Sequence, residues 1–179
     1  MKALLIVDVQ NDFCPSGALP TPKGDAVVPV INKIIDKFPL VVGVRDWHPE
    51  NTEHFKIWTP HCIQGTKGAE YHPDLRTDKI DYIFSKGTGI KDDGYSAFEV
   101  TDVKLAEFLR SKGVTKLYVT GLTIEYCVKA SALDAVKEGF DVYLVRDAVE
   151  AIYAKEGDVE NAEKELKDAG VKFVLSDEL

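Results

Sequence analysis

The chain lacks the features that mark secreted, membrane-spanning and nucleic-acid-binding proteins. Its 179 residues include only three cysteines, an odd number without a disulfide framework, as is typical of a reducing compartment. No apolar run approaches the roughly 20 residues of a membrane-spanning helix, and the apolar run that ends at Asp8 is too short for a signal peptide. The net charge of -8 argues against the basic face that nucleic acids or anionic membranes require. We therefore expect a cytoplasmic protein with neither a nucleic-acid nor a membrane partner.

Linkers, low-complexity tracts and internal repeats are also absent. The composition, with 45% apolar and 29% charged residues, is that of an ordinary globular protein. A chain of this length is long enough to bury a proper core and fits one domain. We therefore expect residues 1–179 to form a single domain.

Short apolar runs alternate with amphipathic helical patterns. The apolar runs predict strands at residues 3–7, 40–44, 82–84, 116–120, 142–145 and 171–175. Helical patterns lie between them, at 25–38, at 102–111, from about 127 to the glycine at 139, and at 159–169. This alternation predicts an α/β fold, a doubly wound and mostly parallel sheet of about six strands with helices on both faces.

Residues that carry chemistry follow four of the predicted strands. Asp8 follows the first strand, Asp46 the second and Lys86 the third. The fourth leads to Cys127 in the first turn of a helix, where free N–H groups and the helix dipole favour a thiolate. Ligands of open α/β sheets bind outside the carboxyl ends of the strands. We therefore expect these four side chains to share one crevice.

Together these residues resemble a nucleophile with its activators. Lys86 can lower the pKa of the Cys127 thiol, and Asp8 can accept its proton. The backbone N–H groups between Thr123 and Cys127 lie where a tetrahedral intermediate needs an oxyanion hole. Each residue alone also has a structural interpretation, because a lone cysteine is usually a small buried apolar residue and an aspartate or lysine at a strand end can serve a turn or the surface.

A second cluster lies in the irregular segment 47–78, which shows no clean periodicity; such segments in compact domains are usually functional. It holds His48, His54 and His61, shortly after Asp46. Asp46 and His48 project to the same side of an extended backbone, and imidazoles with one carboxylate suit zinc, iron or manganese. A single histidine is more often a hydrogen-bonded polar residue, so the residues alone leave metal binding and packing open.

Four aromatic residues fall in predicted loops: Phe13, Trp47, Trp58 and Tyr95. Large aromatic side chains are usually core residues. Their loop positions also make them candidates for the walls of an aromatic-lined pocket.

The motifs resemble those of one family, the nicotinamidases or pyrazinamidases of the isochorismatase-like cysteine hydrolases. The resemblance covers essentially the whole chain. It rests on residues 8–13 (DVQNDF), 46–49 (DWHP) with 54–55 (HF), 58–66 (WTPHCIQGT), 86–88 (KGT), 95–98 (YSAF) and 126–128 (YCV).

The resemblance implies a site with three parts. The first is a catalytic triad of Asp8, Lys86 and Cys127. The second is an oxyanion hole formed by the backbone of Thr123 and Cys127, with a cis peptide bond between Leu122 and Thr123. The third is one divalent metal ion, held by Asp46, His48, His54 and His61. We expect this ion to be zinc, with iron or manganese as the alternatives.

The resemblance also implies the activity. Nicotinamide, and pyrazinamide with it, would be hydrolysed to the acid and ammonia through a thioester on the cysteine. Phe13 and Trp58 match positions that sandwich the pyridine ring, with Leu122 and Tyr95 as further substrate-binding residues. The partner is then a small aromatic amide, and the protein a homo-oligomer such as a dimer.

Two departures from the family pattern and two rival interpretations remain. The family usually has Thr-Asp where this chain has Ile124-Glu125, and some members have a histidine where this chain has Thr52. One rival is another hydrolase of the superfamily, an isochorismatase or a carbamoyl amidohydrolase, which lacks the metal cluster. The other is a non-catalytic module that binds a metal or ligand.

Overall fold

A strand that is buried at every position after its first residue runs through the middle of the molecule. In this computed structural model, which describes residues 1–179, it is β1 (Lys2–Val7). Its side chains alternate between two cores, with Leu5 in one and both Leu4 and Ile6 in the other, and all three are 0% exposed. A strand covered on both faces needs apolar residues at every position, which explains the continuous apolar run.

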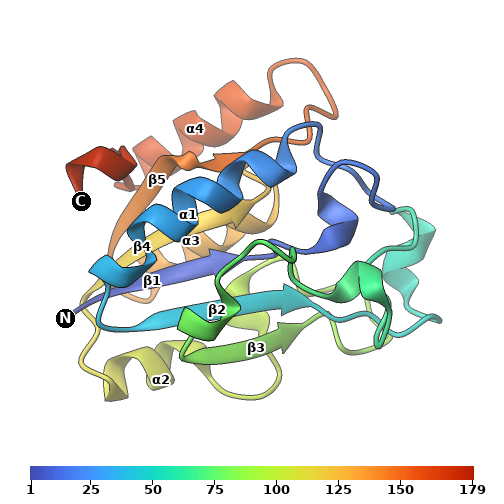
Figure 1. The fold of residues 1–179 in the computed structure, drawn as a ribbon, viewed down its shortest axis with the longest axis horizontal. Helices are drawn as coiled ribbons and strands as arrows, with labels where there is room; N and C mark the ends of the chain where they lie inside the picture. The colour runs from blue at the N-terminus through green and yellow to red at the C-terminus, as the bar shows by residue number, and fades with distance from the viewer.

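Five more strands flank β1, and every pairing between neighbours is parallel. The order across the sheet is β3-β2-β1-β4-β5-β6 (Figure 1). The added strands are β2 (Val41–Asp46), β3 (Tyr82–Lys86), β4 (Lys116–Leu122), β5 (Asp141–Glu150) and β6 (Lys172–Val174). The predicted parallel six-stranded α/β sheet is confirmed. The strand order reverses beside β1, and ligands of such sheets bind at this switch point.

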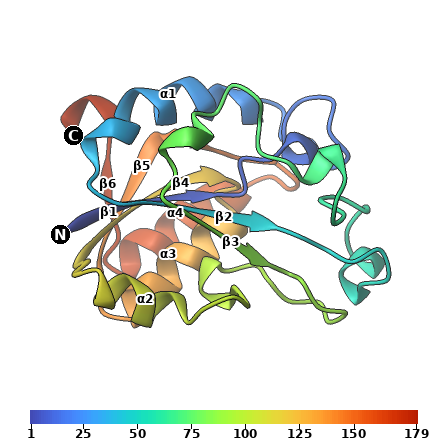
Figure 2. The ribbon, with the colours of Figure 1, turned by 60° about the horizontal axis from the view of Figure 1, so that its bottom comes forward.

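Helices cover both faces of the sheet (Figure 2). α1 (Val27–Ile34) lies on one face. On the other face lie α2 (Leu105–Ser111), α3 (Cys127–Lys137) and α4 (Asp158–Asp168). None of the helices combines the length and apolar character that crossing a bilayer requires.

Two helices are shorter than their sequence patterns predict. The pattern at 25–38 contains α1 with a 3-10 turn at each end, Gly24–Ala26 and Ile35–Lys37, and such turns are common at helix ends. α2 begins three residues later than predicted, and the side chain of Asp102 binds β3 instead of lying in the helix. Its Oδ2 accepts the Ser85 N–H at 3.0 Å.

β5 is longer than the predicted run at 142–145 because polar Arg146 and Asp147 interrupt the apolar pattern while the strand continues. The β4–β5 register shifts after Val119, and the ladder ends with Leu122 opposite Glu150. The end of β5 therefore lies beside the turn that leads to α3.

The irregular segment 47–78 contains only short 3-10 turns. Its first part, which carries the three histidines, lies past the carboxyl ends of β2 and β3, and its last residues run back beside α1 to the start of β3 (Figure 2). Cys14 and Cys62 are buried in the α1-side core as free thiols.

Candidate active site

The structure brings the four strand-end residues together. Asp8 follows β1 directly, and Asp46 and Lys86 are register partners at the ends of β2 and β3. Cys127 is the first residue of α3. Asp8 has a φ of 52°, which is uncommon for a residue other than glycine and is often found at functional sites. The parallel sheet thus brings together, at the carboxyl ends of its strands, four residues that lie far apart in the sequence.

Lys86 is the centre of this group and is 0% exposed. Its Nζ lies 2.8 Å from Asp8 Oδ2, 2.5 Å from Asp46 Oδ1, 2.7 Å from Gly94 O and 3.5 Å from Cys127 Sγ. Burial alone would lower the pKa of Lys86, but the charges of Asp46 and Asp8 outweigh it and hold that pKa well above its ordinary value. Lys86 therefore remains a cation.

The same surroundings set the pKa values of Asp8 and Cys127. Burial, with the nearby charge of Asp46, raises the pKa of Asp8 to about 7, against the opposing effect of Lys86. Burial also raises the pKa of Cys127 well above its ordinary value, although Lys86 acts to lower it. This differs from the expectation that Lys86 yields a resting thiolate, because burial of the thiol, with the charges of Asp8 and Asp46, outweighs the effect of the lysine on the Cys127 pKa. A neutral thiol therefore lies beside Asp8, whose pKa of about 7 suits a group that accepts and returns a proton.

The turn between β4 and α3 leaves several backbone N–H groups without a partner, two of them at Thr123 and Cys127. Thr123 O accepts the N–H groups of Tyr126 and Val128, each at 3.1 Å. The N–H groups of Thr123 and Cys127 donate to no group of the protein. A cis peptide bond joins Leu122 and Thr123, as the family resemblance implies.

The three histidines of the irregular segment are buried and converge. One ring nitrogen of each lies within 4.8 Å of those of the other two. The Nδ1 atoms each have a partner, namely Gly87 O for His48 (2.9 Å), Asp92 Oδ1 for His54 (2.6 Å) and Thr59 O for His61 (2.6 Å). Such partners fix the tautomer and orientation of metal-binding imidazoles and leave each Nε2 as the ligand atom.

The donor set fits a zinc ion. His48 Nε2 is buried without a hydrogen-bond partner, 3.5 Å from Asp46 Oδ2, and His61 Nε2 is 3.8 Å from the same oxygen. Three imidazole nitrogens and one carboxylate oxygen are ligands that zinc takes at about 2 Å. The other oxygen of Asp46 contacts Lys86. Asp46 therefore joins the metal-binding cluster to the triad.

Gly87 makes room for His48. Its φ is +63°, and a Cβ at this position would overlap the imidazole ring of His48. Glycine, which has no Cβ, both adopts this backbone conformation without strain and leaves space for the imidazole ring of His48.

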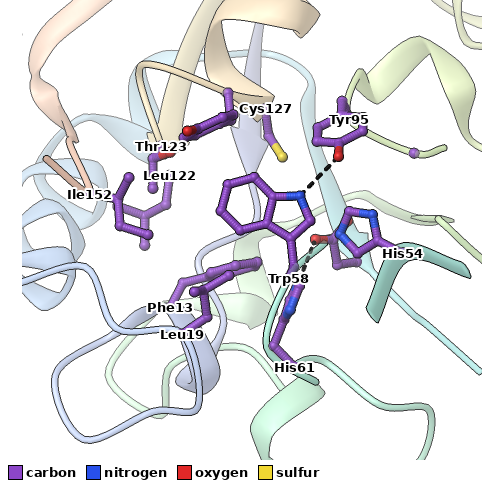
Figure 3. Close-up of a pocket in the computed structure, with 13 residues that line it drawn as sticks. Phe13, Leu19, His54, Trp58, His61, Tyr95, Leu122, Thr123, Cys127 and Ile152 are labelled. Carbon is purple, nitrogen blue, oxygen red and sulfur yellow. Dashed lines mark hydrogen bonds and ion pairs between the residues drawn. The ribbon is translucent and has the colours of Figure 1, made fainter. Parts of the chain in front are cut away.

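Asp92 is a functional candidate that the sequence did not reveal. Its Oδ1 accepts hydrogen bonds from His54 Nδ1 at 2.6 Å and from the Tyr95 hydroxyl at 3.2 Å. The Trp58 Nε1 in turn donates to the Tyr95 oxygen at 2.9 Å (Figure 3). The only sequence signal was an acidic, glycine-rich loop. Asp92 thus connects a metal-binding histidine to two aromatic residues.

We predict that Asp92→Ala weakens zinc binding about 10- to 100-fold, because the second partner of a metal-bound imidazole orients the ring and raises its basicity. Competition of the protein with a chromogenic chelator measures this affinity. Asp93→Ala is the matched control, since it removes the same charge from the same loop. Equal zinc affinities of the two variants would contradict the role of Asp92.

A narrow aromatic slot opens beside the thiol (Figure 3), with about 420 Å³ of empty space. Its walls include every substrate-binding residue predicted from the resemblance, namely Phe13, Trp58, Tyr95 and Leu122. Asp46, His54, His61, Thr123 and Cys127 also line it. The slot therefore joins the thiol to the metal-binding cluster.

The slot differs from the expectation in a few residues. Trp47 is not in its wall, but packs against the α1-side core with the Arg45 guanidinium 3.9 Å from its ring. Leu19, Tyr126 and Ile152 are wall residues that the sequence did not reveal. Leu19 and Ile152 lie in turns without periodicity or motif, so no sequence signal could have found them, whereas Tyr126 belongs to the motif at 126–128 and its position beside Cys127 was a signal.

Comparisons with known proteins give consistent matches. The family model described as isochorismatase domain matches residues 2–178. The nicotinamidase/pyrazinamidase of Mycobacterium tuberculosis (strain ATCC 25618 / H37Rv) is 36% identical over 98% of this chain and 100% of its own length. The pyrazinamidase of Pyrococcus horikoshii in complex with zinc has a TM-score of 0.88 at 47% identity, covering 97% of this chain and 98% of that one. PnC1 from L. infantum in complex with nicotinate has a TM-score of 0.92 at 36% identity, covering 99% and 93%.

Proposed function

Since this chain belongs to the isochorismatase family, we propose that it is a nicotinamidase, a metal-containing amidase that hydrolyses nicotinamide to nicotinate and ammonia. One observation carries the proposal, namely that a thiol, its neighbouring base and a zinc-type donor set meet at one aromatic slot. Relatives named nicotinamidase or pyrazinamidase, one solved with zinc and another with nicotinate, support it. We extend the activity to pyrazinamide, because one ring nitrogen changes little in a stacking pocket.

In this proposal Asp46, His48, His54 and His61 hold the metal, which we take to be zinc. When bound, it supplies a Lewis acid at the end of the slot that orients the ring of the amide. Phe13 and Trp58 hold the two faces of the ring, and Leu122 and Tyr95 complete the wall.

Cys127 is the proposed nucleophile. Asp8 accepts the thiol proton, and Sγ forms a bond to the carboxamide carbon while the Lys86 charge stabilises the developing thiolate. The N–H groups of Thr123 and Cys127 donate to the oxyanion of the tetrahedral intermediate. The C–N bond then breaks, and the proton on Asp8 passes to the leaving nitrogen, which departs as ammonia.

Water completes the cycle. Asp8, ionised again, takes a proton from a water molecule whose oxygen attacks the thioester carbon. The C–S bond breaks, nicotinate leaves, and Sγ regains a proton from Asp8. Each turnover thus consumes one water, and the residues return to their starting state.

The deciding experiment measures ammonia release from nicotinamide. We expect the protein to be active as purified, to lose activity on chelation, and to regain it on addition of zinc, with iron and manganese as separate additions. Activity that resists complete chelation favours another hydrolase of the superfamily. A protein that binds zinc and nicotinate but releases no ammonia with any of these metals is a non-catalytic module.

The proposal extends to location and assembly. Three free cysteines are compatible with a reducing compartment, and we therefore place the protein in the cytoplasm. From the family resemblance we propose a homo-oligomer such as a dimer, which the mass in solution tests.

A further inference from the structure

Glu125 is a buried carboxylate outside the proposed triad and metal-binding cluster. It lies in the turn between β4 and α3, two residues before Cys127, and is 5% exposed. A carboxylate almost never occupies such a position unless its oxygens are paired. The partners of Glu125 therefore indicate its role.

Those partners are two successive backbone N–H groups after β5. Glu125 Oε1 accepts the Tyr153 N–H at 2.8 Å, and Oε2 accepts the Ile152 N–H at 3.2 Å. The adjacent Ile124 N–H donates to Glu150 O at 3.0 Å. The regular β4–β5 ladder ends at Glu150. The Glu125 side chain thus continues the connection between the two segments beyond the last paired residues.

The segment held by Glu125 needs such a connection. Tyr153 has a φ of 56°, a left-handed conformation that is unfavourable for a residue with a side chain. Its side chain is 58% exposed, so packing of the ring does little to fix it. Consecutive N–H groups that face one anion stabilise such a bend. The carboxylate of Glu125 is that anion.

The bend matters because Ile152 is part of the slot wall. Ile152 and Leu122 lie on one side of the slot, with Phe13 and Leu19 below them (Figure 3). The turn that carries the thiol therefore also fixes, through Glu125, a wall against which the substrate ring packs.

We propose that Glu125 is a positioning residue for substrate binding, which holds residues 151–153 so that Ile152 closes the slot around a flat six-membered ring. This inference rests on the proposed function. The carboxylate does not touch the reacting atoms, so its loss should affect the binding of the amide more than the chemistry. The family usually has an aspartate at this position. Its side chain is shorter by one methylene and would have to reach the same two N–H groups.

The test compares Glu125→Gln with Glu156→Gln, which removes the charge of an exposed residue nearby in the same loop. The glutamine amide offers one oxygen where the carboxylate offers two, and its NH₂ group faces a backbone N–H. We expect Glu125→Gln to raise KM for nicotinamide about tenfold, as loss of a hydrogen bond to a charged group does, with kcat within about threefold. Glu156→Gln should leave both constants unchanged. A fall in kcat without a rise in KM would overturn the proposal.

A double-mutant cycle shows whether Glu125 acts through the wall. If it does, Glu125→Gln should add less than about a twofold loss in kcat/KM to an Ile152→Ala background, because the side chain being positioned is already gone. If the losses in kcat/KM of the two single variants multiply in the double variant, Glu125 does not act through Ile152.

Hydrogen exchange tests the contact without relying on turnover. The amides of Ile152 and Tyr153 should exchange at least about tenfold faster in Glu125→Gln than in Glu156→Gln. Unchanged exchange would overturn the proposal even in an active enzyme. Faster exchange in a protein that releases no ammonia would support the contact while the proposed function failed. Should Glu125→Gln not fold, Glu125→Asp keeps the charge and should give a smaller change of the same kind.

Discussion

Replacing Cys127 by alanine will lower kcat for ammonia release from nicotinamide by a factor of at least about 10⁴, the scale seen when a covalent nucleophile is removed. No other thiol can take its place, since Cys14 and Cys62 are buried in the α1-side core. Without Sγ, the only route left is direct attack by water, for which the free N–H groups of the turn give modest help.

The measurement is ammonia release by a coupled assay on protein free of other amidases. The variant should remain folded, with a free energy of unfolding within about 1–2 kcal/mol of wild type, because only one sulfur atom leaves a partly exposed position. Binding of nicotinate, measured by calorimetry, should persist and shows that the slot is intact. Cys127→Ser, nearly the same size, is the steric control and should be almost as inactive. Activity of Cys127→Ala above about 1% of wild type would remove the thioester mechanism.

Replacing Lys86 by methionine will cost both stability and activity. Methionine fills a similar volume but leaves the buried carboxylates of Asp8 and Asp46 without their cation, at 2.8 and 2.5 Å from the lost Nζ. Removing one partner of a buried ion pair typically costs about 3–5 kcal/mol, because the other charge stays buried and uncompensated. Without the ammonium, kcat should also fall about 10³-fold or more, since thiolate formation beside two carboxylates loses the cation that lies 3.5 Å from Sγ.

Urea unfolding gives the free-energy difference, and the ammonia assay gives kcat. Lys91→Met serves as control, because it removes the same charge from an exposed position in the loop after β3. Its stability should match wild type within about 0.5 kcal/mol. Full activity in folded Lys86→Met protein would contradict the assigned role of the lysine.

The gathering of the site was predictable from the sequence because it depends on strand ends. A parallel sheet places the carboxyl ends of its strands at one edge, so apolar runs that end in Asp8, Asp46 and Lys86 already determine which side chains meet. The sheet itself followed from the alternation of apolar and amphipathic segments. Here local pattern and global fold agree.

What the sequence could not reveal depends on distances between segments. Ile152 lines the slot because β5 continues past Arg146 and Asp147 to Glu150. Beyond that strand, the side chain of Glu125 binds the backbone of Ile152. The pKa of Cys127 is raised because the folded chain buries the thiol beside Asp8 and Asp46, which no local pattern encodes. Asp92 has a role because a loop brings it to the Nδ1 of His54.

The central position of β1 has a consequence for how activity is acquired. Its two neighbours, β2 and β4, come from distant parts of the chain, and the Thr120 hydroxyl bonds Leu5 O across 115 residues. Such long-range parallel pairings are slow steps in folding. Cys127 reaches the site only when β4 pairs with β1. An amino-terminal fragment that ends before β4 would hold the base, the lysine and every histidine of the metal-binding cluster, and still be inert.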